Sequence, residues 1–153
     1  MIFSSGGGEA IDVACVIMET IPATYGFPLP EEGYLARVKE MGERYGTLYI
    51  ADEVQTELAR TGKLWGVEHY GKEPDILVMA KGLSGGIYPI GATVVNEAAG
   101  NWMKEDGFAH ISTFGGSELG CIVAMKVLEI SKRQEVLENV GYVRVIYVQG
   151  LKR

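Results

Sequence analysis

Two short apolar runs, each ending in a charged residue, constrain the fold of this chain more than any other feature. Residues 48–51 precede the carboxylate of Asp52, and residues 76–80 precede the amine of Lys81. Short apolar runs between turn signals are typical of buried parallel strands, although a buried helix segment gives the same pattern. If both runs are parallel strands of one α/β sheet, both charges leave it at the carboxyl edge, where open α/β sheets bind ligands.

An acid and an amine at one sheet edge suit the chemistry of pyridoxal phosphate in particular. A lysine can form a Schiff base with this cofactor, and a carboxylate keeps its pyridine nitrogen protonated, so that the ring withdraws electrons. Pairing with the ring nitrogen would also offset the cost of burying Asp52. The 29 positions from Asp52 to Lys81 (81 minus 52) leave room for a crossover between the strands. The alternative interpretation is a surface lysine and a helix-capping aspartate.

The segment before Asp52 predicts a strand, a helix and a second strand. Residues 13–18 form an apolar run that ends in Glu19, and Pro30 is expected to start a helix that Gly46 ends. One apolar stripe at helical spacing supports this helix. Its members are Tyr34, Val38, Met41 and Tyr45. This order of elements predicts a right-handed βαβ unit.

The segment after Lys81 predicts a further strand and a long helix. Residues 92–95 have the pattern of a strand, and Ser117 is suited to cap a helix. We expect an apolar stripe of that helix to be buried against the sheet. Its members are Leu119, Val123, Val127 and Ile130. Beyond Gly141, β-branched residues weaken the helical pattern.

Composition excludes several classes of function. The net charge of −6, with no basic face in the sequence, argues against a nucleic-acid partner. No apolar run approaches the roughly 20 residues of a membrane-spanning helix. Cys15 and Cys121 are interpreted as buried thiols of a cytoplasmic protein, rather than as a disulfide or a metal pair. The sequence therefore predicts no metal site.

Five motifs occur in an order that resembles one enzyme family. They are IADEVQT at 50–56, RTGKLW at 60–65, HYGKEPDILVMAKGLSGG at 69–86, PIGA at 89–92 and HISTFGG at 110–116. From about residue 13 to 140 the chain is similar to class III aminotransferases, the ω-aminotransferase branch of fold type I pyridoxal phosphate enzymes. The resemblance implies an α/β fold like the aspartate aminotransferase large domain. It has a mainly parallel sheet flanked by helices, with one antiparallel strand at 92–95.

The resemblance implies a role for each site residue. Lys81 would hold pyridoxal phosphate as an aldimine, and Asp52 would pair with the ring nitrogen. The residue that matches Val54 packs on one face of the ring, and the residue that matches Gln55 bonds near the phenolic oxygen. The residue that matches Thr113 binds the cofactor phosphate of the neighbouring subunit, which implies a homodimer. Without the resemblance, Thr113 belongs to an ordinary turn before a helix.

The implied reaction is transamination, from an ω-amino acid or diamine donor to a keto acid or aldehyde. The same scaffold also supports aminomutases. Residues 11–140 match part of the large domain, with a flexible leader expected at 1–10 and a tail or fraying helix at 141–153. Because the family's N-terminal phosphate loop and C-terminal small domain have no counterpart here, a catalytically inactive fragment that acts only by association is an alternative.

The motif around Asp52 departs from the family at one position. Glu57 stands where the family usually has glycine after Thr56. If that glycine needs a positive φ, glutamate would be costly there. Glu53 is interpreted as a structural acid.

Overall fold

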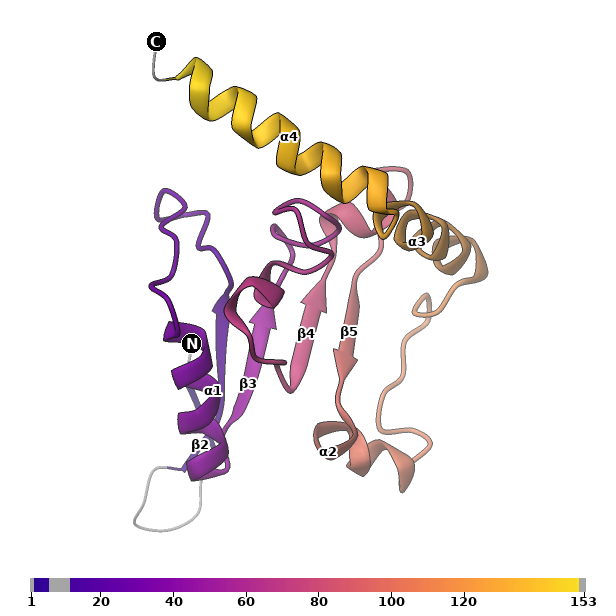
Figure 1. Cartoon of the computed structure of the whole chain (residues 1–153). Helices are drawn as coiled ribbons and strands as arrows, with labels where there is room; N and C mark the ends of the chain where they lie inside the picture. The colour runs from indigo at the N-terminus through magenta and orange to yellow at the C-terminus, as the bar shows by residue number, and fades with distance from the viewer. Residues whose placement is uncertain (1, 6–11, 152–153) are drawn as a thin grey trace.

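One five-stranded sheet forms the centre of the computed structural model, which describes residues 2–5 and 12–151. The strands lie in the order of the sequence (Figure 1). They are β1 (Ile2–Ser5), β2 (Asp12–Glu19), β3 (Leu48–Asp52), β4 (Ile76–Met79) and β5 (Ala92–Val95). Together with the helices around the sheet they form an α/β fold, as predicted.

The register of the sheet brings three strand ends to the same level. β2, β3 and β4 are parallel, whereas β1 and β5 pair antiparallel at the two edges. Glu19 lies opposite Asp52, and Asp52 lies opposite Val78. The predicted parallel strands and the predicted antiparallel strand at 92–95 are therefore confirmed. The sequence did not predict the antiparallel pairing of β1.

The leader predicted for residues 1–10 is partly wrong. Ile2–Ser5 pairs with β2 as a strand, with an irregularity in the register between Phe3 and Ser4. Residue 1 and residues 6–10 lie outside the described part of the chain.

α1 (Tyr34–Tyr45) begins four residues later than predicted. Pro30 does not start it, because Gly33 takes a left-handed conformation with φ 72° and separates the preceding turn from the helix. Gly46 ends the helix as predicted, also left-handed, and its N–H bonds the carbonyl of Gly42.

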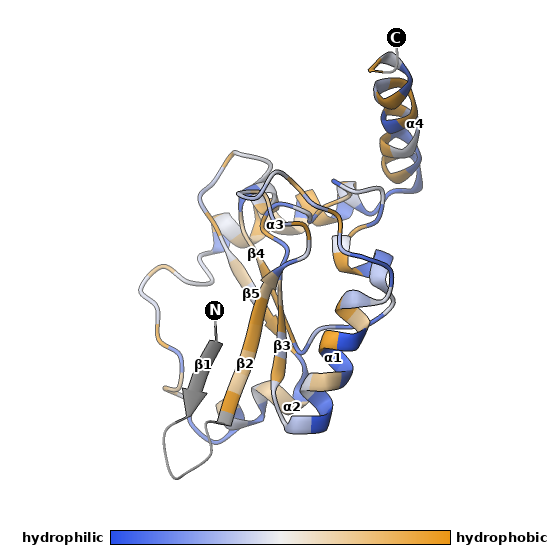
Figure 2. Cartoon of the chain, turned by 90° about the vertical axis from the view of Figure 1, so that its left-hand side faces the viewer, coloured by the Kyte–Doolittle hydropathy of each residue, from blue (hydrophilic) through white to orange (hydrophobic). Residues whose placement is uncertain are grey.

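The core forms where α1 packs against β3. Leu35 of α1 is buried together with Tyr49 and Ala51 of β3. Successive side chains of a strand point to opposite faces of the sheet, so Tyr49 and Ala51, two positions apart, share one face. Val67 belongs to the same core cluster. Figure 2 shows apolar residues along β2 and β3 and polar residues on the outer side of α1.

The remaining elements surround the carboxyl edge and the β5 side of the sheet. They are the 3₁₀ helices η1 (Gly66–Tyr70), η2 (Lys81–Ser84) and η3 (Asn101–Lys104), and the α-helices α2 (Glu97–Gly100), α3 (Glu118–Ser131) and α4 (Gln134–Gly150). α4 is continuous through Gly141 and projects away from the sheet (Figure 1), where the sequence predicted a tail or a fraying helix.

A different face of α3 is buried from the one predicted. Leu119 and Ile130 at the ends of the predicted stripe are exposed and its members Val123 and Val127 are partly buried, whereas Gly120 and Ala124 are buried. The reason is Gly120, whose missing side chain lets α3 approach Tyr88 closely. A Cβ at this position would lie 2.9 Å from Cε1 of Tyr88. Ala124 then joins Met79 and Leu83 in a second core cluster.

Gly120→Ala should lower the free energy of unfolding by about 1–2 kcal/mol, because the overpacking against Tyr88 outweighs the better helix propensity of alanine. Gly141→Ala is the matched control, since nothing lies within 4 Å of a Cβ there. It should leave stability unchanged or raise it. Urea unfolding followed by circular dichroism measures both, and a loss of equal size in the two variants would contradict the packing argument.

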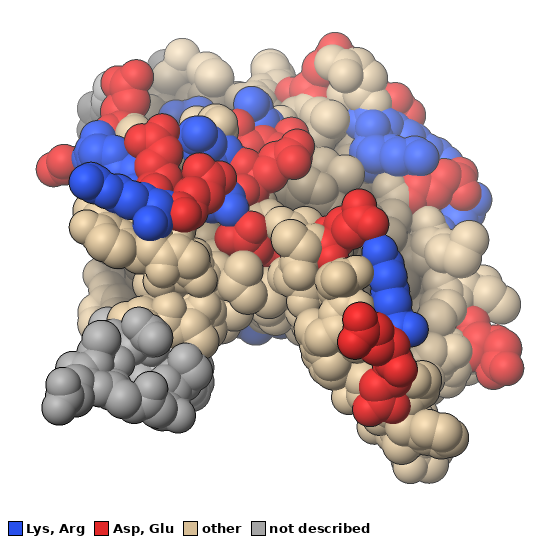
Figure 3. Space-filling view, turned by 90° about the horizontal axis from the view of Figure 1, so that it is seen from below, with Lys and Arg blue, Asp and Glu red and all other residues tan. Residues whose placement is uncertain are grey.

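The surface mixes both signs of charge. Figure 3 shows Lys and Arg side chains next to Asp and Glu side chains on the face seen from below, without a continuous patch of one sign. No helix within residues 12–151 combines the length and the apolar character needed to cross a membrane. Cys15 and Cys121 are free, and they are only partly buried rather than buried as predicted.

Candidate active site at the carboxyl edge of the sheet

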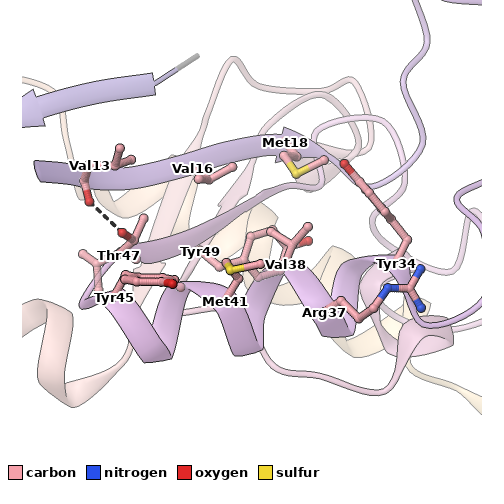
Figure 4. A pocket seen from close by; sticks show the side chains of 12 residues that line it. Val13, Val16, Met18, Tyr34, Arg37, Val38, Met41, Tyr45, Thr47 and Tyr49 are labelled. Atoms are coloured by element: carbon pink, nitrogen blue, oxygen red, sulfur yellow. Dashed lines mark hydrogen bonds between the residues drawn. The ribbon is translucent and has the colours of Figure 1, made fainter. Parts of the chain in front are cut away.

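Two hollows of similar size differ in their chemistry. The first is an apolar groove of about 670 Å³ between α1 and β2 (Figure 4). Met41 and Tyr45 of the predicted α1 stripe line it and are exposed. Among the described residues, the lining contains one charged side chain, that of Arg37, and no acid. This groove therefore lacks the acid–amine pair that the sequence predicts.

The second hollow lies at the carboxyl edge of the sheet and has a volume of about 730 Å³. The segment that follows β3 contributes Val54, Gln55 and Glu57 to its wall, and η2 contributes Lys81 and Gly82. Three of the predicted site residues, Val54, Gln55 and Lys81, thus line one hollow. We take this edge as the candidate site.

Lys81 is the first residue of η2, and its side chain is exposed. The chain turns sharply after β4, where the N–H of Leu83 bonds the carbonyl of Ala80 at 2.6 Å. Gly85 ends η2 in a left-handed conformation with φ 59°. The two bends hold the lysine backbone at the end of the sheet and leave its amine accessible.

Asp52 is the last residue of β3 and is partly buried. One of its oxygens, Oδ1, accepts a hydrogen bond from the N–H of Val54 at 3.0 Å, which fixes the turn that follows the strand. Asp52 lies opposite Val78 on β4, three positions before Lys81. The acid and the amine therefore follow neighbouring parallel strands at one edge, as predicted, although Asp52 is not part of the hollow's lining.

Thr113 lies apart from the other predicted site residues. It belongs to the exposed segment between η3 and α3 and does not line the hollow of Lys81. The segment turns at Ser112, whose hydroxyl accepts a hydrogen bond from the N–H of Gly115 at 2.9 Å. Within this chain, Thr113 and Lys81 do not contribute to the same pocket.

Glu53 is fully buried, and its carboxylate is occupied by protein donors. The N–H groups of Gly66 and Val67 donate to it at 2.6 and 2.8 Å, and the hydroxyl of Thr56 donates at 2.9 Å. Thr20, after the end of β2, also donates to it. This pattern supports the interpretation of Glu53 as a structural acid.

Glu57 is a buried acid at the site that no sequence pattern predicts. Its residue is only 4 % exposed, and neither carboxylate oxygen has a hydrogen-bond partner among the described residues. Burial raises the pKa of Glu57 to about 7, although nearby backbone N–H groups oppose this shift. The available signal was the departure from the family motif at this position.

The backbone strain expected at Glu57 from a positive φ occurs at the two residues that follow it. Leu58 and Ala59 have φ values of 54° and 65°, in the left-handed region, whereas Glu57 is not among the residues with positive φ. Such a conformation costs an L-residue about 1–2 kcal/mol. Glu57 therefore escapes the backbone cost that its sequence position suggested.

The residues at this edge fit pyridoxal phosphate by their chemistry. The accessible amine of Lys81 suits the aldehyde of the cofactor, and the carboxylate at the neighbouring strand end suits its pyridine nitrogen. The apolar Val54 suits a face of the ring, and the amide of Gln55 suits the phenolic oxygen. Gly82 and Gly85, which have no side chains, line the hollow beside Lys81.

Sequence comparison supports this interpretation of the edge. An aminotransferase of Archaeoglobus fulgidus is 59 % identical over 141 residues, which cover 88 % of this chain and 33 % of that protein. A putrescine aminotransferase of Pectobacterium atrosepticum is 42 % identical over 142 residues, covering 93 % of this chain and 30 % of its own length. The chain thus spans about a third of the length of these curated relatives.

Solved structures share the fold. An aminotransferase of Bacillus anthracis superposes with a TM-score of 0.84 at 35 % identity, covering 92 % of this chain and 32 % of that one. A taurine:2-oxoglutarate aminotransferase of Bifidobacterium kashiwanohense, solved in complex with PLP and glutamate, gives a TM-score of 0.84 at 28 % identity, covering 90 % and 31 %.

The family description matches almost the whole chain. The sequence pattern of "Aminotransferase class-III" covers residues 8–153. Together with the sheet edge that carries Asp52 and Lys81, this match establishes that the chain belongs to the class III aminotransferase family.

Proposed function

We propose that this chain contributes the cofactor-binding lysine, Lys81, to a pyridoxal phosphate site. The reaction at this site is the transfer of an amino group from a primary amine to a keto acid or aldehyde. The observation that carries the proposal is the register of the sheet, since Asp52 and Lys81 follow neighbouring strands at the edge where α/β proteins bind ligands. Pyridoxal phosphate is the cofactor that the family indicates.

Each residue at the edge has a proposed role in holding the cofactor. The amine of Lys81 attaches it covalently, and Asp52 pairs with the ring nitrogen. Val54 contacts one face of the ring, and Gln55 donates toward the phenolic oxygen. When bound, pyridoxal phosphate supplies an electron sink that acidifies a C–H bond beside the amino group.

The second role of Lys81 is proton transfer. With the cofactor and an amine donor bound, the free Nζ of Lys81 would remove a proton from the donor carbon and return it to the product, as general base and acid. The exposure of Lys81 supports this role, because an accessible amine can be displaced and still remain in reach.

We infer a donor with a terminal amine, of the ω-amino acid or diamine type. Relatives of this chain are named for putrescine and ornithine, which both carry such an amine. Thr113 is proposed to bind the cofactor phosphate in a neighbouring subunit of a homodimer. Its exposed position, away from the hollow of Lys81, supports a role outside its own subunit.

Titration of the purified chain with pyridoxal phosphate, followed by borohydride reduction and peptide mapping, tests the proposal. We expect a visible absorbance band and one reduced adduct, on Lys81. Lys81→Ala should lose both, whereas Lys126→Ala, which removes an exposed amine from α3, should keep them. Adducts scattered over surface lysines, or none at all, would instead favour a chain that is inactive by itself.

A further inference from the structure

The carboxyl group of Glu57 lies against the turn that carries Lys81. A Cβ placed on Gly82 would lie 3.4 Å from Oε1 of Glu57 and 3.9 Å from its Cγ. The nearest atom to that position is Cδ1 of Leu58 at 3.3 Å, and the two distances to Glu57 are ordinary contact distances, so the backbone of the turn lies directly against the carboxyl group. Gly82, the residue after the proposed cofactor lysine, therefore contacts the buried Glu57.

The polar surroundings of this acid come from the backbone of the same turn. The N–H groups of Ala80, Gly82 and Leu83 favour the ionised form of Glu57. None of them forms a hydrogen bond of normal geometry with it, so that both oxygens remain without a partner among the described residues. Hydrogen-bond donors stabilise the ionised form of such a buried acid more than its neutral form, whereas burial destabilises the ionised form.

Few charged side chains lie around Glu57 that could change its pKa. Glu53, on the same segment, repels its ionised form, and Arg60 and Lys81 are the cationic residues that line the same hollow. α3 contributes the neutral side chains of Val127 and Ser131 to this lining. Ile21 and Phe27 add apolar side chains, and the segment after β3 adds the neutral polar side chains of Gln55, Thr56 and Thr61. The donors that lower the pKa of Glu57 are nevertheless backbone N–H groups of the Lys81 turn.

We propose that Glu57 is a positioning residue for Lys81, whose protonation state sets how firmly residues 80–83 are held. Ionised Glu57 attracts the N–H groups of Ala80 and Gly82, since that of Leu83 is already bonded to the carbonyl of Ala80, and it thereby restrains the turn. Protonated Glu57 is a much weaker acceptor and releases it. The amine of Lys81 is consequently more reactive when Glu57 is protonated, because the turn that carries it is looser.

The switch operates near neutral pH. Burial raises the pKa of Glu57 to about 7, which places both protonation states within the range in which enzymes of this kind work. The importance of Lys81 rests on the proposed function, whereas the coupling between Glu57 and the turn does not. It is a property of the chain without cofactor.

Two measurements on the full chain without cofactor test the coupling. In the unsubstituted protein, the amide resonances of Gly82 and Leu83 should titrate between about pH 5.5 and 8.5, a range that brackets the pKa of about 7. The acetylation rate of Lys81, relative to that of Lys104 and Lys126, should fall about fivefold on the alkaline side, the ratio that one typical net hydrogen bond is worth.

Glu57→Gln should abolish both effects, and the exposed Glu73→Gln should retain them. Amide resonances of the unsubstituted chain that stay constant over this range would overturn the proposal, as would an acetylation profile that Glu57→Gln leaves unchanged. If Glu57→Gln does not fold, the titration of the unsubstituted chain decides the question. Because no cofactor is present, a failed cofactor titration would leave this result standing.

Discussion

Glu53→Ala should lower the free energy of unfolding by about 4 kcal/mol, which is a large part of the stability of a typical domain. The substitution removes one buried acceptor that serves four donors. The N–H groups of Gly66 and Val67 and the hydroxyl groups of Thr20 and Thr56 would all lose their partner. Each buried donor without a partner costs about 1–3 kcal/mol, although water that enters the space recovers some of this loss.

The effect is large because Glu53 connects segments that are distant in sequence. Thr20 follows β2, and Gly66 begins η1, so that one carboxylate joins the ends of two strands to the helix beside them. A Cβ at Gly66 would lie 2.8 Å from Cβ of Thr56, which shows how closely these segments approach. Loss of Glu53 should therefore disturb the geometry of Asp52 and Val54 next to it.

Glu68→Ala is the matched control for Glu53→Ala. Glu68 accepts one hydrogen bond, from the N–H of Trp65 at 2.7 Å, and it is exposed. Its loss should cost about 1 kcal/mol, as for a typical helix cap. Urea unfolding of the two variants compares the values directly. Equal losses would show that the buried network around Glu53 contributes no more than a surface cap.

The strand ends of the site could be predicted because they depend on local sequence. An apolar run, its terminal charge and the turn that follows lie within a few residues of one another, and this information placed Asp52 and Lys81 at one edge. Parallel strands of one sheet bring their carboxyl ends to the same edge, so this placement can be predicted without knowing how the side chains pack. The family motif supplied the roles of Val54 and Gln55, which remain predictions.

The packing of α3 could not be predicted from its own pattern. The stripe at Leu119 has helical periodicity, yet the helix buries the face of Gly120, because Tyr88 and Ile90 offer a surface that accepts close approach there. That surface lies about 30 positions earlier in the sequence. Hydrophobic periodicity detects a helix, but the contact face depends on which residues the rest of the fold brings to it.

Glu57 shows the same limit within the site. The sequence drew attention to this position only as a departure from a family pattern. Its burial follows from η2, which passes over it at Gly82, and the raised pKa follows from that burial. No local signal distinguishes such an acid from an exposed one, because its surroundings are supplied by a segment 25 residues later (82 minus 57).

Asp75→Ala should lower the free energy of unfolding by about 3–5 kcal/mol, because it leaves a buried ammonium group without its partner. No pattern in the sequence predicts this pair. Asp75 accepts from Lys39 at 2.7 Å and from Asn96 at 2.9 Å through Oδ1, and from the N–H of Tyr49 at 2.9 Å through Oδ2. Lys39 and Asp75 are only 9 % and 8 % exposed. One carboxylate thereby joins α1, β3 and the end of β5.

Glu43→Ala is the control for Asp75→Ala. Glu43 lies 3.4 Å from the amine of Lys39 but is more than half exposed. An exposed pair of this kind is worth about 0.3–0.5 kcal/mol. Urea unfolding at neutral pH should therefore separate the two variants clearly. Similar losses would mean that Lys39 finds another partner when Asp75 is removed.

The pair should also define a range of pH in which it stabilises the fold. Burial opposes ionisation of Asp75, but the hydrogen bond from Lys39 and the N–H of Tyr49 outweigh it and lower the pKa below its ordinary value of 3.8. A lowered pKa contributes stability above the unfolded value, and this contribution is lost as the pH falls through the folded value. Burial likewise opposes the charge of Lys39, yet Asp75 raises its pKa above 10.5.

The contribution of Lys39 has the opposite sign with pH, since it is complete below 10.5 and is lost as the pH rises through the raised value. The difference in unfolding free energy between the unsubstituted chain and Asp75→Ala should thus be largest between about pH 4 and 10 and should shrink beyond both limits. Unfolding curves at a series of pH values measure this difference. A difference that stays constant through both limits would show that Asp75 stabilises the fold by packing rather than by its charge.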